Sequence, residues 1–216
     1  MRVAIMQPNF IPWMGYFKLI ETSDLFIFLD DVEYSKNTWH NRNNLLLSDR
    51  SIYLWTLPIR ASSSKQNFNN IFIDQNSLRI NKLKNLLSQN FKKSANFDIF
   101  EKILDIIADQ SLPLSIVNEN IIKLMSIYLG ITTNTQRASE VLSEGMRSEK
   151  ILGLLKEVGA STYIAVDGAK SYMMEDDFEE FFPGEIEFFK FSCEYSRQKL
   201  DGRQDNLSAL NYILDN

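Results

Sequence analysis

Residues 2–29, RVAIMQPNFIPWMGYFKLIETSDLFIFL, decide the fold of this chain. Two short apolar runs, 2–6 and 25–29, have the Val, Ile and Phe content of buried strands. Between them, Pro12 suits the first turn of a short helix. Strands that are apolar on both faces are typical of a parallel sheet covered by helices. The stretch therefore predicts a βαβ unit at the start of an α/β protein.

Strand-like and helix-like segments continue to alternate through the rest of the chain. The further predicted strands are residues 51–59, 131–135, 163–166 and 185–191. The predicted helices are residues 76–91, 96–109, 113–129, 149–158, 175–182 and 207–214. We therefore expect one α/β domain over residues 1–216, with a mainly parallel Rossmann-like sheet and a helical insertion at about 75–130.

The composition is that of a soluble globular protein, with 44% hydrophobic and 24% charged residues in a chain of 216. The net charge of −5 disfavours a nucleic-acid partner, because proteins that bind duplexes usually carry a basic excess. No apolar run approaches the roughly 20 residues that span a bilayer, and the N-terminus lacks the apolar core of a signal peptide. We therefore expect a cytoplasmic protein without a membrane span.

Polar and aromatic residues are concentrated directly after the second strand, in residues 30–43, DDVEYSKNTWHNRN. Asn and Arg beside Tyr and Trp are typical of surfaces that hold a polar ligand through forked hydrogen bonds and stacking. The alternative is a polar loop whose Asn residues make local turns. Because ligands of open α/β sheets bind beyond the carboxyl ends of the strands, this position favours binding. Gln7 follows the first strand, so we expect both stretches to meet in one cleft at that edge.

Two adjacent acids at the end of the second strand, Asp31 and Asp30, are the predicted catalytic residues. A carboxylate there is placed to act as a general base or to accept hydrogen bonds from sugar hydroxyls. With Glu33 they offer oxygen ligands for Mg²⁺, but adjacent acids at a strand end are more often one ligand-facing group and one turn cap. We assign no metal to the site, and the sequence identifies no cofactor.

The predicted ligand-binding residues of the two stretches are Gln7, Trp13, Tyr16, Lys36, Asn37, Trp39, Asn41, Arg42 and Asn43. The Lys and the Arg suit phosphate, with structural ion pairs to the neighbouring acids as the alternative. The three Asn residues suit hydroxyl or amide groups. The aromatic residues suit stacking on a sugar or a base, although each alone is more often part of a core.

The chain contains one histidine, His40, and one cysteine, Cys193. No second catalytic signature accompanies the histidine, so we expect a partly exposed bystander. The cysteine has no marker of a nucleophile and is interpreted as a buried, inert thiol. It also excludes an internal disulfide and a cysteine-rich zinc site. The sequence has no glycine-rich phosphate loop and no serine-hydrolase elbow.

Two motifs resemble those of the WbqC-like proteins: residues 6–20, MQPNFIPWMGYFKLI, and the stretch 30–43. Weaker similarity continues in GASTY and GAKSY, residues 159–163 and 168–172. The similarity covers nearly the whole chain, and the first two motifs are specific. The chain departs from the family pattern at residues 195–198, where YSRQ stands in place of Tyr-Pro-Gln.

The resemblance implies a role in making or modifying a sugar, because the family is associated with bacterial surface-polysaccharide gene clusters, including those of O-antigen in lipopolysaccharide. It adds Gly168 and Tyr172 to the predicted ligand-binding residues. We predict a transferase that acts on a nucleotide-linked amino sugar, with N-acylation as the reaction. Asp31 would deprotonate or orient the acceptor amine while the Lys and Arg side chains hold phosphate.

The opening βαβ unit also resembles that of the nucleotidylyl-transferase and pantothenate-synthetase folds. Those proteins grip nucleotide phosphates with a His-x-Gly-His turn, and only Gly15 stands at the corresponding place here. That departure puts nucleotidyl transfer in doubt. Two other functions are compatible with the sequence: a non-catalytic partner that binds a nucleotide sugar in a biosynthetic complex, and an ATP-using ligase.

Overall fold

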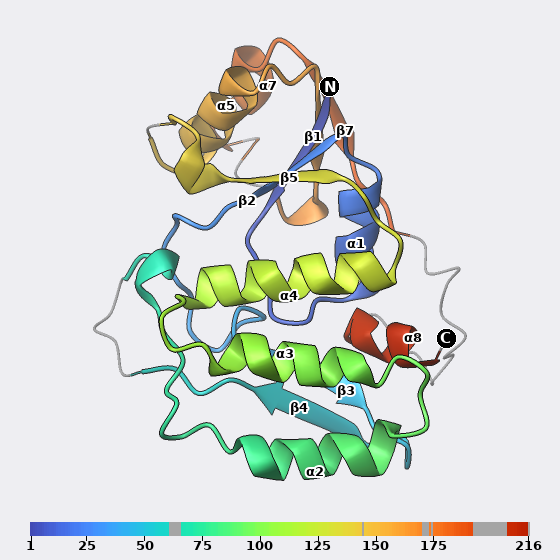
Figure 1. The fold of residues 1–216 in the computed structure, drawn as a ribbon. Helices are drawn as coiled ribbons and strands as arrows, with labels where there is room; N and C mark the ends of the chain where they lie inside the picture. Colours follow the sequence, from blue (N-terminus) through green and yellow to red (C-terminus); the bar gives the residue numbers. More distant parts are fainter. Residues whose placement is uncertain (61–65, 144, 170–172, 174, 192–206, 216) are drawn as a thin grey trace. The chain divides into compact units, whose positions relative to one another are not determined.

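A computed structural model describes residues 1–60, 66–143, 145–169, 173, 175–191 and 207–215 (Figure 1). These residues form two compact units, each assembled from separate segments of the chain. The first unit contains residues 1–7, residues 15–30 and the described residues between 132 and 194. The second contains residues 8–14, the described residues between 31 and 131, and those between 195 and 216. A single domain over residues 1–216 stays a prediction.

The first unit is built on a five-stranded sheet with the strand order β5-β2-β1-β6-β7. Every neighbouring pair of strands in this sheet is parallel. The predicted α/β fold with a mainly parallel sheet is therefore confirmed. The strands are β1 (Arg2–Met6), β2 (Leu25–Phe28), β5 (Asn134–Arg137), β6 (Thr162–Ala165) and β7 (Glu185–Phe188).

The strand–helix–strand start of the first unit follows from its sequence. Val3 pairs with Leu25 and Met6 with Phe28, so β1 and β2 lie side by side in parallel. Helix α1 (Met14–Glu21) connects them and begins shortly after the loop that contains Pro12. The predicted βαβ unit is present.

Among the described residues after β5, helices α5 (Ser148–Glu157) and α7 (Phe178–Phe181) and two short 3₁₀ helices accompany this sheet. Helix α5 lies beside α7 in Figure 1. The ring of Phe178 packs 5.7 Å from that of Tyr163 on β6, which helps to join α7 to the sheet. The 3₁₀ helices are η2 (Ala138–Glu140), directly after β5, and η3 (Asp167–Ala169), after β6.

The second unit contains an antiparallel hairpin, β3 (Arg42–Leu46) and β4 (Ile52–Thr56). The sequence predicts a strand at 51–59 but none at Arg42–Leu46, because RNNLL is rich in residues that are depleted in strands. The Asn43 side chain explains this strand: its Nδ2 donates to the carbonyl oxygens of Phe10 at 3.1 Å and Ile11 at 3.0 Å. These tertiary contacts override the local preference.

The helical middle of the chain lies in the second unit, where Figure 1 shows α2, α3 and α4 running alongside one another. Its core includes Trp55, whose ring lies 5.1 Å from that of Phe10 and 6.4 Å from that of Phe100. No helix among the described residues is long and apolar enough to cross a membrane. The helices are η1 (Phe68–Asn70), α2 (Ile80–Phe91), α3 (Asp98–Ala108), α4 (Leu114–Tyr128) and α8 (Ala209–Asp215).

Candidate functional site

Candidate site residues lie at or shortly after the carboxyl ends of four strands in the first unit. Gln7 comes directly after β1, Asp30 lies two residues after β2, and Arg137 ends β5. Gly168 lies in η3, shortly after β6. Because these strands are parallel neighbours, their carboxyl ends lie at one edge of the sheet, where open α/β sheets bind ligands.

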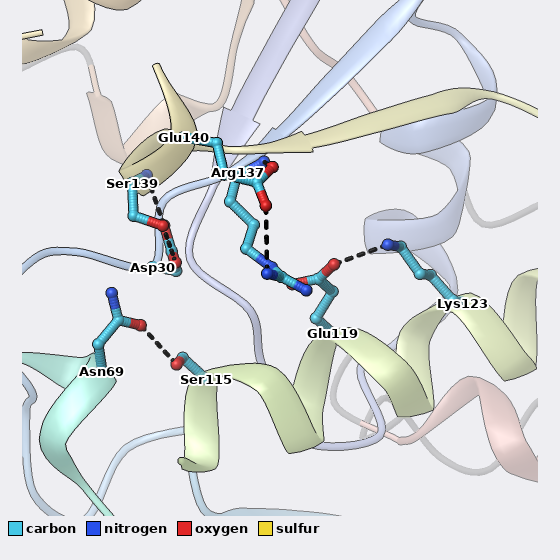
Figure 2. Close-up of polar contacts among 8 residues, drawn as sticks. All are labelled: Asp30, Asn69, Ser115, Glu119, Lys123, Arg137, Ser139 and Glu140. Atoms are coloured by element: carbon cyan, nitrogen blue, oxygen red, sulfur yellow. Dashed lines mark hydrogen bonds and ion pairs between the residues drawn. The ribbon is translucent and has the colours of Figure 1, made fainter. Parts of the chain in front are cut away.

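Asp30 is buried at this edge, with 1% of its surface exposed, and is bound to Ser139 in η2. The Ser139 amide donates to Oδ1 at 3.0 Å, and its hydroxyl donates to Oδ2 at 2.7 Å (Figure 2). A carboxylate that accepts from both a backbone amide and a hydroxyl is held rigidly. The pair links the end of β2 to the segment that follows β5.

Arg137 lies two residues before Ser139 and forms an ion pair with Glu140. Its Nη1 lies 3.2 Å from Oε1 of Glu140. Figure 2 shows this ion pair as a dashed line. The sequence marks Arg137 and Ser139 only through their position after a short strand. The structure shows what that position does, because Ser139 anchors the predicted catalytic Asp30.

The segment after Asp31 is attached to η1 in the second unit. Asn67 Nδ2 donates to the backbone carbonyl of Asp31 at 2.9 Å, and the Phe68 amide donates to that of Val32 at 2.8 Å. The Tyr34 amide donates to the carbonyl of Gln66 at 2.9 Å. These contacts hold residues 31–34 alongside residues 66–68.

His40 is buried among aromatic rings, with 4% of its surface exposed, and is not the partly exposed residue that the sequence suggests. Its ring centroid lies 4.7 Å from that of Phe68 and 5.7 Å from that of Tyr34. Burial lowers the His40 pKa to about 4, against an opposing hydrogen bond with the Ser35 backbone. At neutral pH the imidazole is therefore uncharged.

A pocket of about 340 Å³ opens beside this aromatic group in the second unit. Three of the predicted ligand-binding residues line it: Lys36, Asn37 and Asn41. The sequence gives no signal for Arg60, which also lines it and lies far from both motifs. The remaining lining residues are Tyr34, Thr56, Leu57, Pro58 and Ile59. The pocket is thus partly apolar with a few polar groups, as ligand sites usually are.

Hydrogen bonds to the backbone fix the polar wall of this pocket. Asn41 Nδ2 donates to the carbonyl of Leu57 at 2.9 Å, and the Leu57 amide donates to that of Asn41 at 2.7 Å. Asn37 has a positive φ of 59°, and Arg42 Nη2 donates to its carbonyl. Arg42 itself is not among the lining residues, so its direct contact is with the turn that shapes the pocket.

The predicted aromatic residues occupy different environments. Tyr16 is buried in the first unit, where its hydroxyl donates to the carbonyl of Gln7 at 3.1 Å. In the second unit, Trp39 is 44% exposed, and Trp13 is partly buried and forms a bridge with Ser208. None of the three lines the pocket of about 340 Å³. Tyr172 and Cys193 lie outside the described residues.

Helix α4 carries buried polar residues that its apolar pattern conceals. Ser115 Oγ donates to Asn69 Oδ1 at 2.7 Å, and Lys123 Nζ lies 2.7 Å from Glu119 Oε1 (Figure 2). Asn118 Nδ2 donates to backbone carbonyls of both N-terminal motifs. Polar residues that recur three and four positions apart in the otherwise apolar sequence of α4 are the pattern from which these contacts could have been predicted.

No group of three or more His, Cys, Asp or Glu side chains suited to a metal ion is found among the described residues. The pocket of the second unit is lined instead by two cationic side chains and two carboxamides, and the strand edge of the first unit carries the buried Asp30.

The fold and the site define a class of protein. It is an α/β protein with polar residues at a strand edge and a small pocket lined by two cationic side chains. The model of the WbqC-like protein family matches residues 7–216, and the chain belongs to this family. The chain is also 30% identical over 182 residues to the uncharacterized protein Rv1507c of Mycobacterium tuberculosis. That alignment covers 83% of this chain and 78% of the mycobacterial protein. No solved structure matches the chain.

Proposed function

We propose that this protein modifies a nucleotide-linked amino sugar during the synthesis of a bacterial surface polysaccharide such as O-antigen. Support comes from its membership of the WbqC-like family, because the resemblance to that family implies a role in making or modifying a sugar. The observation that carries the proposal is the pocket that residues of the second motif line in part. Lys36, Asn37 and Asn41 line it, and these residue types suit phosphate and sugar hydroxyls.

The Asn41 side chain adds a further argument for a polar ligand. Its Oδ1 is buried and has no hydrogen-bond partner within the described part of the chain. Buried polar atoms normally have a partner, and an amine or hydroxyl of a ligand would supply one after a small shift of the groups that cover this oxygen. Nδ2 is already bonded to Leu57, which fixes the orientation of the carboxamide.

The reaction that we propose is transfer of an acyl group to the sugar amine, with Asp31 as the general base. The amine nitrogen forms a bond to the carbonyl carbon of an activated acyl donor, and the bond from that carbon to the leaving group breaks. Asp31 accepts the proton that the nitrogen loses. Asp30, held by Ser139, and Gln7 belong to the proposed site at the strand edge, with Gly168 and Tyr172 as further ligand-binding residues.

A second candidate function is non-catalytic binding of a nucleotide sugar. The observation that favours it is the pocket lining, which contains two cations but neither a carboxylate nor an imidazole among the described residues. Such a pocket offers binding groups without a proton acceptor. Saturable binding without turnover would support this candidate.

The test is calorimetric titration with UDP-, dTDP- and GDP-linked amino sugars, followed by mass spectrometry after incubation with acyl-coenzyme A. We expect saturable binding of at least one sugar and a product that is heavier by the acyl group. Lys36→Gln should weaken binding about tenfold, because a charge-assisted hydrogen bond is lost. Lys82→Gln, on the exposed face of α2, is the matched control. Failure of every nucleotide sugar to bind would contradict both candidates.

A further inference from the structure

The pocket in the second unit has a charge opposite to that of the whole chain. Lys36 and Arg60 line it, and no acidic residue does so among the residues described. The chain as a whole carries a net charge of −5. Two cationic side chains in the lining of one small pocket favour an anionic ligand group over a neutral one. Such an arrangement suits a ligand group with more than one negative charge.

Arg60 belongs to a segment that is braced independently of the second motif. Its amide donates to the carbonyl of Phe72 at 3.0 Å, and the amide of Asp74 donates to that of Pro58 at 2.8 Å. The guanidinium carbon lies 5.6 Å from the centre of the Phe72 ring, a cation–π distance. The position of the Arg60 charge is therefore set before a ligand arrives.

Lys36 comes from a separate segment of the pocket lining, in a turn that is held by its own hydrogen bonds. Arg42 binds the carbonyl of Asn37, and the Thr38 hydroxyl donates to the carbonyl of Ser35 at 2.8 Å. The two cations thus belong to segments that are held by separate sets of hydrogen bonds. Preorganised charges lose little entropy on binding, which favours a compact, multiply charged anion.

The pKa of Asp74 is lowered mainly by hydrogen bonding from the Ser77 side chain, and the charge of Arg60 helps to lower it to a smaller extent. No ion pair between Arg60 and an acid is found within the described ranges, and Asp74 does not line the pocket. The Arg60 charge is therefore not neutralised by a direct partner there.

We propose that this pocket binds the diphosphate group of the ligand, with Lys36 and Arg60 each contacting phosphate oxygens. The inference rests on the proposed function, because that function supplies a ligand that contains a diphosphate. A volume of about 340 Å³ is near the lower end for ligand sites, so the pocket receives one part of a nucleotide sugar. Arg60 is a binding residue that neither motif contains.

The experiment uses inorganic pyrophosphate as the probe, titrated calorimetrically into the full-length protein at low ionic strength, with inorganic phosphate for comparison. We expect pyrophosphate to bind more tightly than phosphate. Arg60→Gln and Lys36→Gln should each weaken pyrophosphate binding about tenfold or more. Arg79→Gln, an exposed arginine at the start of α2, is the matched control and should leave binding unchanged. Arg60→Lys keeps the charge and should retain most of the affinity.

The inference is overturned if folded Arg60→Gln binds pyrophosphate as the wild type does, or if Arg79→Gln weakens binding equally. Melting curves establish that each variant is folded. If Arg60→Gln does not fold, unchanged pyrophosphate binding by folded Lys36→Gln overturns the inference. If a nucleotide sugar binds but Arg60→Gln leaves its affinity unchanged, the proposed function stands and this inference fails. If pyrophosphate binds through Arg60 but no nucleotide sugar binds, this inference stands and the proposed function fails.

Discussion

Asn118 on α4 donates a hydrogen bond from Nδ2 to the backbone carbonyl of His40 at 2.7 Å. The same Nδ2 group donates to the carbonyl of Pro8 at 2.9 Å. One fully buried side chain therefore joins the loop of the first motif to that of the second. Both loops are irregular, and this carboxamide supplies a hydrogen-bond donor to one backbone carbonyl in each of them.

Asn118→Ala should lower the free energy of unfolding by about 2 kcal/mol, because two buried carbonyl groups lose their shared donor. Urea denaturation measures this change. Asn120→Ala on the same helix is the control, since this residue is only partly buried, and its effect should be within about 0.5 kcal/mol. Equal effects of the two substitutions would show that the Asn118 contacts contribute nothing.

The Asp30–Ser139 pair should show energetic coupling in a double-mutant cycle. Asp30→Asn replaces one acceptor oxygen by a donor group and removes the negative charge. We expect a loss of about 2 kcal/mol in unfolding free energy. Ser139→Ala removes one hydrogen bond and should cost about 1 kcal/mol. The double variant should be more stable than the sum of the single losses predicts. If the losses of the two single variants add up to that of the double variant, the Asp30–Ser139 contact contributes nothing to the unfolding free energy.

His40 should make the protein less stable as the pH falls. Its pKa is lowered to about 4 by burial, against 6.5 for the ordinary value, so the unfolded chain binds more protons between these two pH values. Stability is therefore full above about pH 6.5 and declines toward pH 4. The expected loss between pH 7 and pH 5 is on the order of 2 kcal/mol.

Urea denaturation at both pH values, compared with His40→Phe, isolates this contribution from that of the carboxylates. The Phe variant cannot be protonated and should lose less stability over the same range. Identical pH dependence in the two proteins would show that His40 is protonated in the folded state as readily as in the unfolded one.

Asp31→Asn should reduce turnover far more than His40→Gln when both variants are assayed with the nucleotide sugar that the wild type binds. Loss of a general base costs on the order of a hundredfold or more in rate. His40 is neutral and enclosed by Tyr34 and Phe68, so its replacement should act mainly on stability. A folded His40→Gln protein without activity, beside an active Asp31→Asn protein, would make the histidine the catalyst.

Arg42→Lys should weaken ligand binding while leaving the melting temperature nearly unchanged. The guanidinium of Arg42 binds the carbonyl of Asn37, and lysine keeps the charge but not the planar donor geometry. The turn at Asn37, whose φ is positive, would then be held less firmly at the wall of the pocket. Calorimetry and thermal melting measure the two effects. A sharp drop in melting temperature would assign Arg42 to the stability of the fold instead.

Local apolar patterning was enough to predict the parallel sheet of the first unit. The runs 2–6 and 25–29 are short, rich in apolar residues and separated by a helix-length segment, and they pair as β1 and β2. The helical middle was equally evident, because its apolar residues recur with a helical period. In both cases the information lies within one short segment of the chain.

Contacts between distant segments decided what the sequence did not reveal. Strand β3 exists in spite of its Asn-rich sequence because Asn43 bonds to the carbonyls of Phe10 and Ile11. Arg60 reaches the same pocket as Lys36 through pairing with residues 72–74, which no local pattern encodes.

The amino-acid sequence by itself thus determined the fold class, the family and the polar stretch 30–43, since each depends on residue type and spacing along the chain. Tertiary structure alone decided which of those polar side chains line a pocket and which hold the backbone. Asn41 and Arg42 are neighbours of similar polarity, yet only Asn41 lines the pocket. The physical reason is that the fold brings hydrogen-bond donors and acceptors together from distant parts of the chain. The local sequence does not determine which donor and acceptor come within hydrogen-bonding distance.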